Sequence, residues 1–187
     1  MLLAGQDLNI IISADEPQII EESSEKAYMS SESNAVLLRK KVANLGTIFS
    51  QAKSPRGITA EDLRVVEEAL REEVLNEIEK FPDGLLQDFF AFPGQAIEVL
   101  PRAIMQISCA IESVEELEEL RGLCRFQKAK LRSVCSESSA EVAIIYSVYR
   151  EMCKDIETKS KELYNSYMHI YELMRHIGDC LKPSLEN

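Results

Sequence analysis

A long apolar stripe near the carboxyl end constrains the fold of this chain more than any other feature. Apolar side chains recur at every seventh position, at Val142, Tyr149, Ile156, Leu163, Ile170 and Ile177. A second column begins at Ile145 and Met152 and is displaced by one position after the polar pair Lys159 and Ser160. An ideal straight helix drifts by about 20° per seven residues, so this displacement keeps the stripe on one side. The stretch from Ser138 to Gly178 therefore predicts a long, straight helix in a bundle.

Both ends of this stretch carry residues that start and stop helices. Ser138 and Glu141 have the spacing of a capping box, and Gly178 is followed by Pro183. A helix of this length spans about 60 Å, whereas a compact domain of this size is about 40 Å across. The helix must kink near residues 158–160, extend beyond the rest of the molecule, or be covered by a second chain. We expect an elongated, all-α bundle of about five helices with some self-association.

Composition excludes several classes of partner. The formal net charge of −11 argues against binding to nucleic acids and to anionic membrane surfaces, because both need a cationic protein surface. The five cysteines form no CxxC pair, and the chain has two histidines, so we expect no structural zinc and no cofactor. The amino terminus has no basic start of a signal peptide, which predicts a cytoplasmic protein with reduced thiols.

The amino-terminal part differs from the remainder in composition. Residues 1–33 include an acidic, serine-rich run with few side chains to bury, which predicts a flexible arm. Residues 34–187 are predicted to form one helical-bundle domain. Asn34 is the expected cap of its first helix, which would end near Gln51 with Gly46 in its interior.

Capping boxes predict two further helices. Thr59 with Asp62 would open a helix that reaches Phe81, and Ser113 with Glu116 would open another that reaches about Val134. The second of these has acids at its start and bases at its end, which suits the helix dipole. Its short link to the long helix predicts that the two run antiparallel. Its basic strip would face either an acidic partner or an acidic surface of this chain, and comprises Arg121, Arg125, Lys128 and Arg132.

The most apolar region lies between residues 85 and 111. Pro93-Gly94 and Pro101 interrupt it, and so do the charged residues Asp88, Glu98 and Arg102. We expect short buried helices in the middle of the bundle, with Pro101 in the first turn of its own helix. Reversible insertion of this region into membranes is an alternative function.

One group of side chains could support chemistry. His169, Glu172 and His176 share one side of the long helix, but the two histidines are about 10 Å apart and cannot bind one ion. We therefore expect no metal site and a salt bridge between Glu172 and His176. The alternative is a small metal- or thiol-dependent enzyme that uses these residues together with Cys153 or Cys180.

The sequence favours a protein without enzymatic activity that binds another protein through helix faces. Such a protein would be an adaptor, a chaperone-like regulator or an assembly subunit. Tyrosine is a common anchor in interfaces, and the long helix is rich in it. The predicted contacts are the basic strip and Tyr146, Tyr164, Tyr167 and Tyr171.

Overall fold

A computed structural model describes residues 16–50, 57–82, 84–134 and 139–184. Within these ranges every secondary-structure element is helical, and the predicted all-α fold with a long carboxyl-terminal helix is confirmed. The elements in chain order are α1 (Glu16–Ser50), α2 (Ala60–Glu68), the π-helix η1 (Ala69–Leu75), α3 (Asn76–Glu79), α4 (Leu85–Phe89), α5 (Pro93–Ser133) and α6 (Ser139–Cys180).

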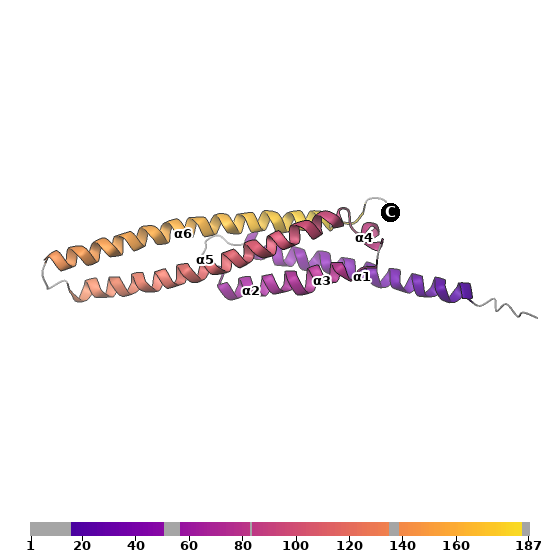
Figure 1. Cartoon of the computed structure of the whole chain (residues 1–187), viewed down its shortest axis with the longest axis horizontal. Coiled ribbons are helices and arrows are strands. Elements are labelled where there is room, and N and C mark those ends of the chain that lie inside the picture. Colours follow the sequence, from indigo (N-terminus) through magenta and orange to yellow (C-terminus); the bar gives the residue numbers. More distant parts are fainter. Residues whose placement is uncertain (1–15, 51–56, 83, 135–138, 185–187) are drawn as a thin grey trace, which may run out of the picture.

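Helices α5 and α6 form an antiparallel hairpin that runs along most of the molecule (Figure 1). Helix α1 packs mainly on α6, and α2 packs mainly on α5. These shorter elements accompany only one half of the hairpin, so the other half projects beyond them (Figure 1). The beginning of α1 projects at the opposite end. The molecule is therefore elongated, and α6 remains helical through residues 158–160, where a kink was one of the expectations.

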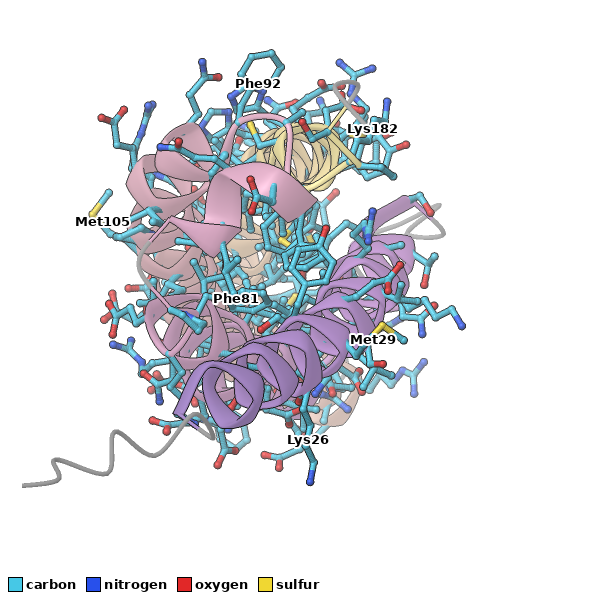
Figure 2. All side chains as sticks on the ribbon, turned by 90° about the vertical axis from the view of Figure 1, so that its right-hand side faces the viewer. Lys26, Met29, Phe81, Phe92, Met105 and Lys182 are labelled. Atoms are coloured by element: carbon cyan, nitrogen blue, oxygen red, sulfur yellow. The ribbon has the colours of Figure 1, made fainter. Side chains whose placement is uncertain are left out.

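The core lies where the hairpin, α1 and the α2–α3 segment meet. An end-on view shows Phe81 pointing inward between the helices, whereas Phe92 and Met105 lie on the outside (Figure 2). The Phe81 ring meets those of Phe89 and Phe90 edge to face, at centroid distances of 6.3 and 5.6 Å. Two backbone hydrogen bonds of 2.9 Å, from Ala91 and Phe92 to the carbonyls of Lys182 and Cys180, close this end of the hairpin.

Helix α1 begins at Glu16, so the expected cap at Asn34 is wrong. Residues 16–33 continue the helix, and residues 1–15 of the predicted arm lie outside the described part of the chain. Between Pro17 and Gly46 the sequence has neither proline nor glycine, and it is rich in glutamate and other residues with good helix propensity. A low content of apolar side chains therefore did not prevent a helix here.

Helix α5 is one helix where the sequence predicted several. Pro93 occupies its first turn, where a missing N–H costs nothing, but Pro101 lies inside the helix and not at a start. Ser113 is also internal, and its hydroxyl donates to the carbonyl of Cys109 at 3.0 Å instead of capping a new helix. Ala96, Leu100 and Ala103, all buried around Pro101, hold the helix together through packing despite the lost backbone hydrogen bond.

The π-helix η1 keeps one apolar stripe of the α2–α3 segment directed toward the core. This stripe advances in three steps of four residues, through Val66, Leu70, Val74 and Ile78. In an ideal α-helix these steps would turn the stripe by about 120° away from the core. The wider turns of η1 absorb that rotation, and all four side chains are fully buried.

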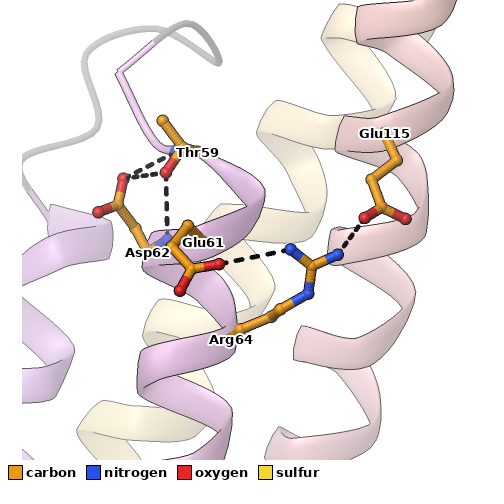
Figure 3. Close-up of polar contacts among 5 residues, drawn as sticks. All are labelled: Thr59, Glu61, Asp62, Arg64 and Glu115. Atoms are coloured by element: carbon orange, nitrogen blue, oxygen red, sulfur yellow. Dashed lines mark hydrogen bonds and ion pairs between the residues drawn. The ribbon is translucent and has the colours of Figure 1, made fainter.

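The capping box at the start of α2 is confirmed. The Asp62 amide donates to the Thr59 hydroxyl at 3.1 Å, and the Thr59 amide donates to the Asp62 carboxylate at 2.9 Å (Figure 3).

We expect Thr59→Ala to lower the free energy of unfolding by about 1 kcal/mol. The hydrogen bonds from Thr59 lower the pKa of Asp62, so the cap stabilises the fold above the ordinary pKa of aspartate. Urea unfolding at pH 7 and pH 3 should show the cost of Thr59→Ala shrinking as the pH falls; an equal cost at both values would contradict the role of the Asp62 carboxylate.

Gly46 lies inside α1, where glycine weakens a helix. A Cβ atom at this position would sit 3.6 Å from the Cβ of Met174, which is ordinary van der Waals contact. We therefore expect Gly46→Ala to stabilise the protein by about 0.5–1 kcal/mol, measured by urea unfolding. A destabilised variant would show that α1 and α6 pack more closely than this distance indicates.

Candidate docking surface

The projecting half of the hairpin begins where α2 begins. Arg64 in the first turns of α2 forms ion pairs with Glu61 and with Glu115 of α5, which fixes the start of α2 against this point of the hairpin (Figure 3). Helix α5 continues for about 27 Å beyond Glu115. We name residues 119–134, at the end of α5, and residues 139–157 of α6 the hairpin tip. Among the described elements, only these two helices run through it (Figure 1).

The inner side of the tip is thinly packed. Val134 and Ile145 are buried, but the other side chains that face across the two helices are only partly covered. Cys124 of α5 and Cys153 of α6 meet there, with 3.7 Å between their sulfur atoms. In the tip, the apolar side of each helix packs against one other helix, whereas in the body of the molecule it packs against two or three.

Large apolar side chains are exposed on the outer side of the tip. Phe126 of α5 and Ile144 of α6 are each 66% exposed. Leu123 lies three residues before Phe126, and Val148 lies four residues after Ile144, so each pair occupies one helix face. Each helix of the tip therefore exposes a pair of neighbouring apolar side chains, and exposed apolar patches are typical of surfaces that bind other proteins.

The predicted basic strip lies along α5 in the same tip. Among the described residues it forms no ion pair with α2, which instead pairs with α5 at Glu115, before the strip begins. Arg125 donates from its Nε to the Arg121 carbonyl at 3.3 Å. The Arg121 Nε is buried without a partner among the described atoms, while Arg125, Lys128 and Arg132 are exposed.

The four predicted tyrosines have different environments. Tyr146 in the tip and Tyr164 beyond it are exposed, and Tyr171 is partly buried against the core. The predicted exposure of Tyr167 is wrong, because this residue is fully buried and its ring centroid lies 6.2 Å from that of Phe49. It continues the stripe of Leu163 and Ile170, which turns it inward. Burial raises the pKa of Tyr167 to about 12.

Several of the side chains singled out for chemistry have partners other than those predicted. Glu172 pairs with Arg175 at 2.7 Å, and not with His176 as predicted. His176 instead places its Nε2 3.8 Å from the sulfur of Cys180. Burial raises the pKa of the Cys180 thiol, which keeps it protonated and a poor nucleophile. Within the described residues, no group of three or more histidine, cysteine, aspartate or glutamate side chains could hold a metal ion.

The apolar region between residues 85 and 111 forms α4 and the first half of α5. Most of its large apolar side chains, among them Phe89, Leu100 and Ile107, are part of the core, whereas Phe92 and Met105 are exposed. Across the described part of the chain, no helix combines the length and apolar character needed to cross a membrane.

The chain was compared with protein-family models, curated proteins and solved structures, and none matches it. The fold and the surface of the tip are therefore the basis on which a function can be proposed.

Proposed function

We propose that the chain is a non-enzymatic protein–protein interaction module, and that the hairpin tip is its docking surface. The observation that supports this proposal is the exposure of Phe126 and Ile144 on a part of the hairpin that no other described element covers. Such a module would serve as an adaptor, a chaperone-like regulator or an assembly subunit.

The composition of the tip indicates the chemistry of its partner. Apolar side chains next to Arg125 and Lys128 resemble an interface with an apolar centre and a charged rim. The complementary surface is an amphipathic helix with acidic residues beside its apolar face. Added to the two helices of the tip, such a helix would cover the exposed apolar side chains of α5 or those of α6. The basic residues would attract the acidic partner and speed its association, and this attraction would weaken as the salt concentration rises.

Photo-crosslinking in the native source tests where partners bind. A photoreactive amino acid at position 126 or 144 should capture a defined partner, whereas the same probe at Val65, an exposed apolar residue of α2, should not. For the captured partner, Phe126→Lys should weaken binding by about 2 kcal/mol or more, as expected for an aromatic anchor. Val65→Lys is the matched control and should bind normally.

Two outcomes would contradict the proposal. Equal crosslinking at positions 65, 126 and 144 would show that the tip has no special role. Normal partner binding by a folded Phe126→Lys and Ile144→Lys double variant, with an unchanged circular dichroism spectrum, would exclude the apolar stripes from the interface. A crosslink to a second copy of this chain would identify the partner as the protein itself.

A further inference from the structure

The two cysteines of the tip are placed as a pair. Cys124 belongs to α5 and Cys153 to α6, so their contact joins the two helices in the half of the hairpin that lacks other support. Their sulfur atoms are 3.7 Å apart, and a disulfide requires about 2.05 Å. Each sulfur would have to move by about 0.8 Å, which is within the reach of a small side-chain rotation. Both side chains are partly exposed, so a small oxidant has access to them.

The surroundings of the pair differ from those of the other described cysteines. Cys109 is exposed on the body of α5, and Cys180 is buried at the closed end of the hairpin beside His176 and Gln95. Among the described residues, neither has a second sulfur at contact distance. Cys135 lies outside the described residues.

Local chemistry sets the conditions under which the pair would react. Burial and the neighbouring Cys153 raise the pKa of the Cys124 thiol, while the positive charge of Lys128 acts in the opposite direction. The Cys153 thiol also contacts the Tyr149 hydroxyl one turn earlier, and this hydrogen bond raises the pKa of Tyr149. The reactive species is the thiolate, so the reaction should be faster at mildly alkaline pH.

We propose that Cys124 and Cys153 form a reversible disulfide, which covalently links α5 and α6 in the hairpin tip, when the protein reacts with a low-molecular-weight disulfide. One cysteine thiolate attacks the oxidant, for which glutathione disulfide is the probe, forms a mixed disulfide and releases one glutathione. The second cysteine thiolate attacks its neighbour's sulfur in the mixed disulfide and releases the other glutathione. Overall, two protein thiols lose two hydrogen atoms and become one disulfide, and glutathione disulfide is reduced to two glutathione thiols. This site does not depend on the tip being a docking surface.

Oxidation of the purified full-length chain with glutathione disulfide at pH 8 tests the proposal. The intact mass should fall by two hydrogen atoms without bound glutathione, and non-reducing peptide mapping should join the peptides of Cys124 and Cys153. Cys124→Ser and Cys153→Ser should each abolish this product. Cys109→Ser, on the same helix as Cys124, is the matched control and should leave it unchanged.

A second measurement reports on the tip without relying on the variants. Trypsin has sites in the tip at Arg125, Lys128, Arg150 and Lys154. Closing the disulfide should slow cleavage there by about tenfold or more, and reduction should restore the original rate. Glutathione that remains attached to either cysteine, a main product that links Cys135 or Cys109 instead, or an unchanged cleavage rate after mapping has located the disulfide would overturn the proposal.

Discussion

Raising the pH from about 10 to about 12 is expected to destabilise the wild-type protein by about 2 kcal/mol more than the Tyr167→Phe variant. Burial raises the pKa of Tyr167 to about 12 in the folded chain, whereas an unfolded tyrosine titrates near its ordinary value of 10. Between these values the folded chain keeps the proton that the unfolded chain loses. Ionisation therefore favours the unfolded state, and stability falls as the pH rises through this window.

At neutral pH the hydroxyl of Tyr167 contributes little to the stability of the fold. Its oxygen is buried and has no hydrogen-bond partner among the described atoms. Replacing such a group by an apolar one of the same shape is nearly neutral or stabilising, so Tyr167→Phe should be at least as stable as the wild type at pH 7.

Urea unfolding at pH 7 and pH 11 measures both effects, and at pH 11 the wild type should lose about 1.4 kcal/mol more than Tyr167→Phe. Tyr164→Phe is the matched control, because Tyr164 lies on the same helix and is 40% exposed. The control should keep the wild-type loss of stability at pH 11, since lysines, cysteines and the other tyrosines titrate alike in both variants. If Tyr167→Phe lost as much stability at pH 11 as Tyr164→Phe, the Tyr167 hydroxyl would not be desolvated in the fold.

Periodicity was sufficient to predict the long helix and its antiparallel neighbour. The stripe through Leu163 and Ile170 is buried as expected, because its direction is a local property of a straight helix. The four-residue steps between Val66 and Ile78 carried an equally local signal for η1, namely a stripe that an ideal α-helix would rotate out of the core.

Helix boundaries were predicted less well, because packing overrides local signals. Pro101 and Ser113 are typical helix starts in sequence, yet both lie inside α5, where contacts with α6 and α2 outweigh the lost backbone hydrogen bond. Asn34 has the same ambiguity, since asparagine caps helices but is tolerated within them. A sequence shows where a helix can begin, and tertiary contacts decide where it does.

The candidate surface was predicted in part. The basic strip and Tyr146 were identified from the sequence, but Phe126 and Ile144 were not. Exposure of an apolar side chain depends on which neighbours are missing, and that depends on where α1 and α2 begin along the hairpin. The buried position of Tyr167 follows the same logic, because a tyrosine on the stripe is covered only where the body of the molecule provides a third helix.

Ile107→Ala is expected to lower the free energy of unfolding by about 3 kcal/mol, because it leaves a cavity where α5 is covered on several sides. Ile107 is fully buried in the core. For a chain of this size the loss corresponds to a fall in Tm of about 6–12 °C. Met105→Ala, two residues away on the exposed side of α5, should change stability by less than about 0.5 kcal/mol.

The same experiment separates the body of the molecule from its tip. Phe126 is larger than Ile107 but is exposed, so Phe126→Ala should cost no more than Met105→Ala. A small cost would mean that the fold gains nothing from this side chain and that it is available to a partner, as the proposal requires. A cost comparable with that of Ile107→Ala, at every protein concentration, would mean that Phe126 is already covered in the free chain. In that case the tip could not serve as a docking surface, whatever the photo-crosslinks show.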